Sequence, residues 1–443
     1  MGVAFGTDGI RGAANVELTA EVAVALGRAA TAVLGTGTWC IGSDTRASSP
    51  MLSAALAAGL ASSGADVIDL GVLPTPGIAY HAQARRAPAA VVSASHNPWT
   101  DNGIKLLAPG GRKLTDALEA AVSANLTAAA PTTSPVVGRI TRASDPVGPY
   151  VDHLVASLDG RRLDGWLVVL DCANGAASEV APLALRAAGA DVVVINDAPD
   201  GNNINDRCGS THPDALRDAV RAHGAAAGLA FDGDADRVVA VAGDGSIVDG
   251  DHIIAICAAD LHARGRLPGD RIALTVMSNL GLRLALAARG IGVVETPVGD
   301  RYVLEAMERD GLALGGEQSG HVIFSNLATT GDGVLTGLVL LDAVARSGQS
   351  LADFAAAAMT RLPQVLRNVA VPVPDRDTVA ESPDVAAAVA DAEEELGATG
   401  RVLLRPSGTE PLVRVMVEAP SEAQALAIAD RLCDVVRKLA GPR

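Results

Sequence analysis

The chain of 443 residues is too long for one ordinary hydrophobic core, and its length indicates about three or four domains. Hydrophobic residues make up 49% of it and aromatic residues only 2%, so its cores must consist mainly of Ala, Val, Leu and Ile. The formal net charge of −16 argues against a nucleic acid partner, which would bind through Lys and Arg. A small phosphorylated ligand needs only a few local cations and is not excluded.

Several other classes of protein lack support in the sequence. The five cysteines form no C-x-x-C pair, so a zinc or redox motif is not indicated. Neither G-x-x-x-x-G-K-[ST] nor G-x-G-x-x-G occurs, which argues against a P-loop ATPase and a Rossmann dehydrogenase. Residues 1–12 do not form a signal peptide pattern, and no apolar stretch reaches the roughly 18 residues that span a bilayer. We therefore expect a cytoplasmic protein without a membrane partner.

The first third of the chain alternates helix and strand patterns. Thr19 can cap a helix that runs to about Leu34, and Pro50 fits the first turn of the next helix. Strands are expected at residues 40–42, 67–70 and 89–93. This βαβ order predicts a mainly parallel sheet covered by helices.

A stretch rich in Ala, Pro, Thr and Ser, residues 128–147, interrupts this order and marks a domain boundary. Further strands are expected near residues 166–170, 192–195, 272–276 and 293–296, and on both sides of 231–237. A helix follows Asp332, and the last unit reads β-α-β-β-α from about Val365. We therefore predict an α/β protein with three similar mixed-sheet domains and a smaller C-terminal α+β domain. The predicted boundaries are 1–145, 146–248, 249–362 and 363–443.

The first segment that indicates chemistry is Ser93–Pro98, which follows an apolar strand and precedes Asp101–Lys105. A serine in a polar loop at the end of a strand is placed to meet a ligand beyond the edge of the sheet. The alternative is a surface turn built from Ser, Asn and Pro.

The second segment, Asp232–Arg237, places three carboxylates at alternate positions after an apolar strand. They repel one another unless a cation neutralises them, and Gly233 and Ala235 are small enough to let the chain fold around one point. Three oxygen ligands with room for a fourth suit Mg²⁺. An EF-hand does not fit, because Arg237 and Gly243 stand where that loop needs Gly and Glu. A solvated acidic turn is the remaining alternative.

The third segment, Gly315–His321, joins two apolar stretches. Glu317 and Ser319 can hydrogen-bond to sugar hydroxyls or to an amine, and the glycines permit close approach of the backbone. Taken alone, the segment is equally compatible with a tight polar loop.

The fourth segment is Arg405–Pro411, with Arg414 just beyond it. Arginine pairs with phosphate oxygens through two parallel hydrogen bonds. Ser407, Thr409 and the backbone N–H groups around Gly408 could complete an anion site. The alternative is an arginine in a structured turn.

Together with Phe5–Gly12, these four segments resemble the α-D-phosphohexomutase superfamily, and the bacterial phosphoglucosamine mutases fit best. The motifs span the chain in the order of the family. The resemblance implies four domains around a central cleft, with one loop from each. It implies an isomerase-class phosphotransferase that interconverts glucosamine 6-phosphate and glucosamine 1-phosphate. This reaction would feed UDP-N-acetylglucosamine and cell-wall synthesis.

The resemblance also implies the roles of individual residues. Ser95 carries the phosphoryl group as phosphoserine, and one Mg²⁺ per chain is bound by Ser95, Asp232, Asp234 and Asp236. The proton of the attacking hydroxyl is accepted and returned by one of four candidates: Lys105, Arg11, His96 or His321. The substrate-binding residues are expected to be Arg237, Glu317, Ser319, Arg405, Ser407, Gly408, Thr409 and Arg414.

The expected partner is a small phosphosugar, with glucose or glucosamine 1,6-bisphosphate as intermediate and activator, and a homodimer is left open. The Glu-Gln-Ser form of the sugar loop favours the glucosamine branch, because phosphoglucomutases and phosphomannomutases more often carry Met at the place of Gln318. Those two activities are the main alternative. A non-catalytic phosphosugar-binding protein is disfavoured, because it would have lost the serine or the aspartates, and all of them are present. A Mg²⁺-dependent phosphatase is also disfavoured, because most acidic-loop phosphatases use an Asp nucleophile.

Overall fold

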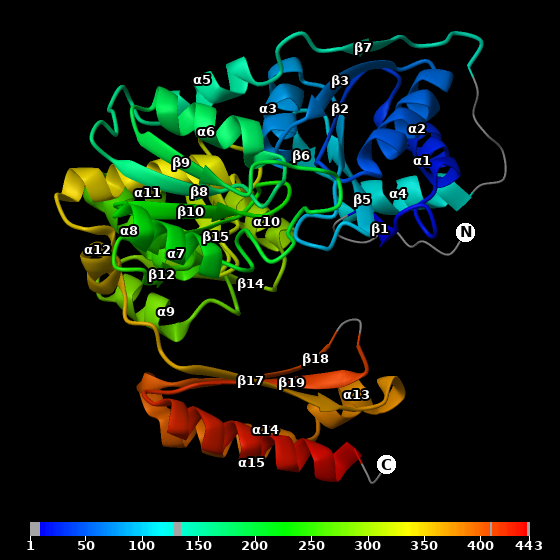
Figure 1. Ribbon diagram of the computed structural model, residues 1–443. Coiled ribbons are helices and arrows are strands. Elements are labelled where there is room, and N and C mark those ends of the chain that lie inside the picture. The colour runs from blue at the N-terminus through cyan, green and yellow to red at the C-terminus, as the bar shows by residue number, and fades with distance from the viewer. Residues whose placement is uncertain (1–8, 128–133, 408–409, 441–443) are drawn as a thin grey trace. The chain divides into compact units, whose positions relative to one another are not determined.

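The computed structural model describes residues 9–127, 134–407 and 410–440, which fall into two compact units (Figure 1). The first unit contains the described residues up to Met277 together with Gly290–Ala358. The second contains Ser278–Arg289 and the chain from Met359 onward. Two predicted phosphate-binding residues, Gly408 and Thr409, lie outside the described residues, as does the first half of the Phe5–Gly12 motif.

The first sheet of the first unit has the strand order β1-β5-β4-β2-β3-β7, with β6 paired to β5. Strands β2, β3, β4 and β7 are parallel, whereas β1, β5 and β6 pair antiparallel. The sheet is thus mixed rather than mainly parallel, because the short loop after β4 can only return the chain as an antiparallel neighbour. Its strands are β1 (Ile10–Ala13), β2 (Thr38–Ser43), β3 (Asp66–Val72), β4 (Ala89–Val92), β5 (Asp101–Ala108), β6 (Arg112–Lys113) and β7 (Ile140–Arg142).

The helices of this first sheet follow the sequence signals closely. Thr19 caps α1, where its Oγ1 accepts a hydrogen bond of 3.5 Å from the Val22 N–H. Pro50 occupies the first turn of α2, where a missing N–H costs no intrahelical hydrogen bond. The core between helices and sheet includes Trp39 and Leu56, both with no exposed surface. The helices are α1 (Ala20–Leu34), α2 (Ser49–Ser62), α3 (Thr75–Arg85) and α4 (Asp116–Thr127).

The second sheet has the order β12-β11-β10-β8-β9. Strands β10 and β8 are parallel, and β10 and β11 are antiparallel neighbours joined by the acidic segment 232–237. The elements are β8 (Leu167–Asp171), β9 (Asp191–Ile195), β10 (Ala227–Phe231), β11 (Val238–Ala242), β12 (Ile247–Val248), α5 (Gly148–Ala156), α6 (Ala177–Ala187) and α7 (Asp214–His223).

The third sheet has the order β14-β13-β15-β16 and combines parallel and antiparallel pairs. The turn between β15 and β16 carries Glu317 and His321. The elements are β13 (Arg271–Thr275), β14 (Gly292–Thr296), β15 (Leu314–Gly316), β16 (Val322–Phe324), α8 (Gly250–Ala263), α10 (Asp300–Asp310), α11 (Gly333–Ser347) and α12 (Leu351–Ala358), with a short 3-10 turn at Pro268–Asp270.

The second unit contains an antiparallel sheet of order β17-β19-β18, with the long helix α15 against it. Residues 278–289 group with this unit, because the Asn279 side chain donates to Glu418 Oε1 at 3.1 Å. This unit thus combines two separate stretches of the chain, 278–289 and 359–443, and the predicted domain boundary at residue 362 stays a prediction. The elements are α9 (Leu280–Ala287), β17 (Gln364–Ala370), α13 (Val373–Ala380), α14 (Pro383–Leu396), a 3-10 turn at Gly397–Thr399, β18 (Arg401–Pro406), β19 (Leu412–Glu418) and α15 (Glu422–Ala440).

Among the described residues, none of the helices combines the length and the apolar character needed to cross a membrane.

Candidate active site

Ser95 lies in the loop between β4 and β5, and only 1% of its surface is exposed. Its Oγ donates a hydrogen bond of 2.6 Å to Asp232 Oδ2, so the loops that follow β4 and β10 meet at this serine. The backbone of Ser95 has φ +52°, a left-handed conformation that is costly for a residue with a Cβ. A serine with a strained backbone and a buried hydroxyl that points at a carboxylate is typical of a functional site rather than of a surface turn.

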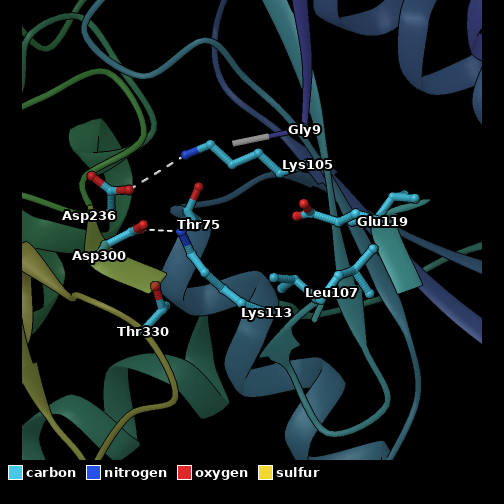
Figure 2. A pocket seen from close by; sticks show the side chains of 11 residues that line it. Gly9, Thr75, Lys105, Leu107, Lys113, Glu119, Asp236, Asp300 and Thr330 are labelled. Carbon is cyan, nitrogen blue, oxygen red and sulfur yellow. Dashed lines mark hydrogen bonds and ion pairs between the residues drawn. The ribbon is translucent and has the colours of Figure 1, made fainter. Parts of the chain in front are cut away.

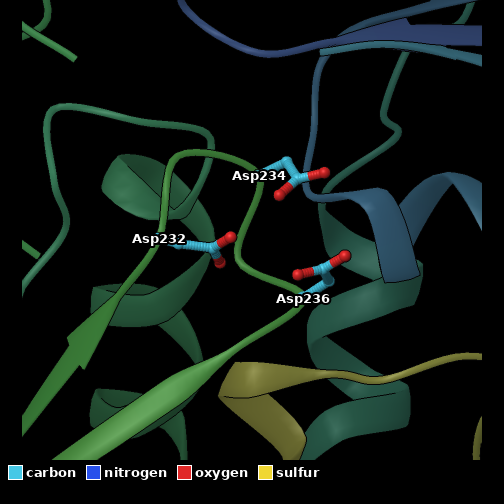
Figure 3. A group of neighbouring side chains, drawn as sticks. All are labelled: Asp232, Asp234 and Asp236. Carbon is cyan, nitrogen blue, oxygen red and sulfur yellow. The ribbon is translucent and has the colours of Figure 1, made fainter. Parts of the chain in front are cut away.

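The acidic segment forms a tight turn whose carboxylates converge (Figure 3). Oxygen atoms of Asp232, Asp234 and Asp236 lie within 4.8 Å of one another, and all three residues are buried. Gly233 is required here, because a Cβ would lie 2.6 Å from the carbonyl oxygen of Ser95. The small residue therefore lets the acidic loop approach the serine loop.

The donor set of the acidic loop fits a hard cation. Among the described residues, Asp234 Oδ1 and Asp236 Oδ1 are buried without a hydrogen-bond partner. Burial, with the negative charges of Asp236 and Asp234, raises the pKa of Asp232 well above its ordinary value. Unpartnered buried carboxylate oxygens are costly, and a divalent cation would satisfy them and remove the repulsion. The solvated acidic turn, which the sequence allowed, does not fit this burial.

Lys105 reaches the acidic loop from β5. Its Nζ lies 3.2 Å from Asp234 Oδ2 and 3.6 Å from Asp236 Oδ2. Thr75, the first residue of α3, also donates to Asp234 Oδ2 at 2.7 Å. Burial by itself raises the pKa of Asp236, but Lys105 and His321 outweigh it and bring that pKa well below its ordinary value.

His321 is buried between two carboxylates. Its Nδ1 lies 3.7 Å from Asp236 Oδ1, and its Nε2 lies 3.7 Å from Asp300 Oδ2. Burial lowers the pKa of His321, but Asp236 and Asp300 outweigh burial and raise it above its ordinary value. His321 Nε2 also accepts a hydrogen bond of 3.1 Å from the Gly331 N–H, an arrangement open only to the neutral ring.

A small cavity of about 20 Å³ lies beside these groups, about enough for one water molecule (Figure 2). Lys105 and Lys113 both line it, and each pairs with a carboxylate from the neighbouring sheets, Asp236 and Asp300 respectively. Burial raises the pKa of Asp300, but Lys113 and His321 bring it to about 2. The cavity wall therefore combines paired charges with apolar side chains such as Leu107 and Leu114.

The remaining proton-transfer candidates lie on the outer side of Ser95. His96 is exposed, and its Nδ1 lies 3.3 Å from Ser95 Oγ and 3.3 Å from Arg237 Nη1. Partial burial and the charges of Arg237 and Arg11 lower the pKa of His96. Arg11 lies on β1, in register with Gly103 on β5. His96 therefore belongs to the serine loop itself, whereas Lys105 reaches the acidic loop from β5.

The predicted sugar loop is a turn tied to the acidic loop. Glu317 accepts hydrogen bonds from the Gly299 N–H at 3.1 Å and from Ser319 Oγ at 3.3 Å. Gly320 has φ +90°, and a Cβ there would lie 2.1 Å from the carbonyl oxygen of Val238. The Val238 N–H donates to the Gly320 carbonyl at 3.1 Å. The turn that carries Glu317 is therefore fixed directly behind Asp236 and Arg237.

The predicted phosphate loop belongs to the second unit. Arg405 on β18 lies opposite Arg414 on β19, and burial together with the charge of Arg414 lowers the pKa of Arg405. Arg414 pairs with Glu410 at 2.6 Å, and Ser407 is buried. Two arginines that face each other across a strand pair repel, and an anion between them would relieve the repulsion.

Four family models match this chain in order. They are described as phosphoglucomutase/phosphomannomutase alpha/beta/alpha domains I, II and III and the C-terminal domain, and they match residues 2–132, 148–245, 249–362 and 369–435. A phosphoglucosamine mutase of Salinispora arenicola is 55% identical and covers 99% of both chains. A phosphoglucosamine mutase of Thermobifida fusca is 57% identical over 98% of both chains.

The chain belongs to the phosphoglucomutase/phosphomannomutase family, in its phosphoglucosamine mutase branch.

Solved structures of this family have the same fold. A phosphoglucomutase/phosphomannomutase family protein of Burkholderia thailandensis superposes with a TM-score of 0.84 at 28% identity, covering 98% of this chain and 97% of the other. An N-acetylphosphoglucosamine mutase of Aspergillus fumigatus, solved with GlcNAc-6P and magnesium, gives a TM-score of 0.72 at 19% identity, covering 99% and 96%. The four-domain architecture predicted from the sequence, three α/β domains and a C-terminal domain, is thus confirmed.

The structure of this family member also brings together residues that the sequence reasoning missed. Asp44 and Arg46 follow β2 and bond to the serine loop, while Asn205 donates to Ser95 O at 2.9 Å. Thr75 and Asp300 contact the acidic loop and His321 respectively. Asp44, Arg46 and Asp300 each come within four residues of the end of a predicted strand. A search for polar residues just after strand ends could therefore have found them. Only the tertiary structure shows which strand ends are neighbours, because these strands belong to three different sheets.

Proposed function

We propose that the protein interconverts glucosamine 6-phosphate and glucosamine 1-phosphate through phosphorylated Ser95 and a 1,6-bisphosphate intermediate. The observation that carries this proposal is the hydrogen bond between the buried Ser95 Oγ and Asp232, within a carboxylate cluster in which two buried oxygens, Asp234 Oδ1 and Asp236 Oδ1, lack a partner. The glucosamine substrate is supported by relatives of 53–57% identity that are phosphoglucosamine mutases. Phosphoglucomutase or phosphomannomutase activity is the alternative.

The acidic loop is the proposed Mg²⁺ site, with Asp232, Asp234, Asp236 and the phosphorylated Ser95 as ligands. When bound, Mg²⁺ would withdraw negative charge from the phosphoryl group and so favour its transfer. This chain's own contribution is to fix the orientation of the serine and to hold positive charge beside it. Lys105 supplies that charge at 3.2 Å from Asp234.

Proton transfer has two kinds of candidate in this geometry. The Nδ1 atom of His96 lies 3.3 Å from Ser95 Oγ, and its lowered pKa leaves the ring neutral near pH 7, which suits a proton acceptor. Lys105 lies among carboxylates and supplies positive charge there. The carboxylates beside His321 raise its pKa, which suits a proton donor, but the form that accepts from the Gly331 N–H is the neutral ring. Arg11, on β1, stays the fourth candidate for proton transfer.

Substrate binding is assigned to the remaining loops. We propose that Arg237, Glu317 and Ser319 contact the sugar, with Glu317 accepting from its amine or hydroxyls. The loop of the second unit would hold the phosphate that does not react, through Arg405, Ser407, Gly408, Thr409 and Arg414. The like charges of Arg405 and Arg414 across β18 and β19 support an anion site there. The intermediate must turn over between the two transfers, so this loop has to accept both orientations.

The test is a coupled assay of glucosamine 6-phosphate, glucose 1-phosphate and mannose 1-phosphate on one preparation, with and without Mg²⁺ and glucose 1,6-bisphosphate. We expect the highest kcat/KM for glucosamine phosphate, and loss of turnover in EDTA. A higher kcat/KM for a glucose or mannose phosphate would replace the proposed substrate by the alternative. Turnover in EDTA would reject the metal site.

Other predictions concern the setting of the enzyme. The domain boundaries at residues 145, 248 and 362, a homodimer and a cytoplasmic location remain proposals of the sequence. Light scattering of the full chain at several concentrations tests the homodimer, and a constant mass of about one chain would reject it.

A further inference from the structure

The serine loop is held by a side chain that takes no part in the chemistry. Arg46 follows β2 and is 1% exposed, so neither substrate nor solvent reaches it. Its guanidinium donates to four backbone carbonyls of the loop that carries the reacting serine. These carbonyls belong to Ser95, Asn97, Pro98 and Asp101.

Every N–H group of this guanidinium is used. Nη2 donates to Ser95 O at 2.9 Å and to Asn97 O at 2.8 Å, Nη1 donates to Pro98 O and Asp101 O, and Nε donates to Asp44 Oδ2 at 2.8 Å. Arginine has five N–H groups in a fixed planar fork, and here all five are satisfied. Lysine, with three donors at one point, cannot span this set.

Asp44 fixes the arginine and the start of the same loop together. Its Oδ2 also accepts from Ser93 Oγ at 2.7 Å, and its Oδ1 accepts from Ser49 Oγ at 2.7 Å and from the Arg46 N–H at 3.1 Å. Ser93 Oγ in turn accepts from the Ser95 N–H at 2.9 Å. The peptide groups on both sides of Ser95 are therefore anchored to one buried ion pair.

This anchoring explains how Ser95 keeps its unfavourable backbone. The left-handed φ of +52° is costly for a serine and persists only where the surroundings over-determine it. In that conformation Ser95 Oγ lies 2.6 Å from Asp232 Oδ2. A loop released from Arg46 would relax toward ordinary backbone angles and turn the hydroxyl away from the acidic loop.

We propose that Arg46 is a positioning residue for phosphoryl transfer, which holds the Ser95 loop in its strained conformation through the loop's backbone carbonyls. The expected change in kcat rests on the proposed function, whereas the expected change in the conformation of the Ser95 loop does not. Because Arg46 is buried behind the loop, its loss should lower kcat and leave substrate KM nearly unchanged. A misplacement of about 1 Å costs about 100-fold in rate, which sets the expected size.

The main test compares Arg46→Lys with the wild-type full chain. Lysine keeps the charge beside Asp44 but releases the carbonyls, so we expect kcat to fall about 100-fold at unchanged KM. Amide hydrogen exchange across residues 95–101 should become faster in the variant, whatever the enzyme's substrate. Arg161→Lys is the matched control, because Arg161 also pairs with a carboxylate, Asp342 Oδ1 at 2.7 Å, on another part of the first unit.

A second variant separates positioning from folding. In Arg46→Ala, added guanidinium at millimolar concentration should restore part of kcat, whereas urea should not, because urea cannot pair with Asp44. If Arg46→Ala does not fold, Asn205→Ala replaces it, since Asn205 donates to the same two carbonyls, Ser95 O at 2.9 Å and Asn97 O at 3.1 Å. In the double variant Arg46→Lys/Asn205→Ala, the fold decrease in kcat should be smaller than the product of the fold decreases in the two single variants, because both side chains hold the same carbonyls.

Two results would overturn the inference. The first is an Arg46→Lys enzyme with wild-type kcat per folded molecule, measured against its thermal melt. The second is unchanged exchange across residues 95–101, which would show that the loop keeps its conformation without the arginine. If the wild-type chain turned over none of the phosphosugars, the proposed function would fail, while the exchange experiment would still decide whether Arg46 holds the loop.

Discussion

The serine and acidic loops of the first unit differ in kind from the Arg405 loop of the second. Ser95 and Asp232 are buried and bonded to each other at 2.6 Å, and their neighbours are held by further hydrogen bonds. Arg405 is half-buried on a strand of a three-stranded sheet, opposite a second arginine. In the proposed function, the first region holds the reacting atoms, which requires rigid geometry. The second would attract a phosphate through positive charge, which requires no unique geometry.

The largest effect is expected at the serine. Ser95→Ala removes the only atom that can carry the phosphoryl group in this proposal, so nearly all activity should be lost. Intact-mass analysis should show one extra phosphate on a fraction of wild-type chains and none on the variant. Ser347→Ala, which removes a hydroxyl from the end of α11, is the control. Substantial turnover by Ser95→Ala would remove the functional distinction between the two regions.

The next effect concerns the acidic loop. Asp234→Ala deletes one carboxylate from a cluster that repels itself, so the fold should survive while activity falls strongly and requires much higher Mg²⁺. Direct titration of Mg²⁺ by calorimetry should show weakened binding, independently of turnover. Asp244→Ala, in the exposed turn before β12, should leave both quantities unchanged. Normal turnover of Asp234→Ala in excess EDTA would show that the loop holds no catalytic metal.

A different kind of effect is expected in the second unit. Arg405→Ala should raise KM in both reaction directions, because charge-assisted contacts to phosphate are roughly twice as strong as neutral ones. The intermediate should also escape more often, so turnover should depend on added glucose 1,6-bisphosphate and Ser95 phosphorylation should fall. Arg367→Ala removes an exposed arginine from β17 of the same sheet and is the control. An unchanged KM without a bisphosphate requirement would contradict the phosphate-binding role.

The smallest effect tests how much the buried polar contacts of the first unit stabilise it. Tyr150 donates a hydrogen bond of 2.6 Å to Asp332 Oδ2, and burial raises the pKa of Asp332 to about 6. Tyr150→Phe leaves a buried acceptor unsatisfied, which should cost about 1–3 kcal/mol in the free energy of unfolding. Urea denaturation measures this loss of unfolding free energy. The control is Tyr302→Phe, because Tyr302 is partly exposed on α10.

The pH dependence of this variant follows from the raised pKa. The folded state holds the Asp332 proton more tightly than the unfolded state, so ionisation of Asp332 lowers stability as pH rises from about 4 to about 6. The Tyr150 hydrogen bond opposes this loss, because it stabilises the ionised carboxylate. Tyr150→Phe should therefore cost more at pH 8 than at pH 5. Equal costs at both pH values would show that Asp332 does not ionise in the folded protein.

Much of the fold follows from local signals in the sequence. Thr19 and Pro50 mark helix starts, apolar runs mark strands, and both kinds of signal act within a few residues. The sequence did not place the antiparallel pairs within the first sheet, because they depend on the direction in which β5 returns after the serine loop. The short strand β7 lies within the stretch that was interpreted as a domain boundary, and its exposed residues lack an apolar pattern.

The sequence by itself determined which residues have the chemistry of the site. Ser95 lies in a loop after a strand, and the three aspartates alternate along one loop, so their types and spacing are local properties. Only the tertiary structure decided that these loops meet, because β4 and β10 belong to different sheets and the missing Cβ of Gly233 lets the two loops approach. It also revealed Arg46, 49 residues from Ser95 in sequence. A buried arginine that binds backbone carbonyls leaves no local pattern, since its partners come together only when the chain has folded.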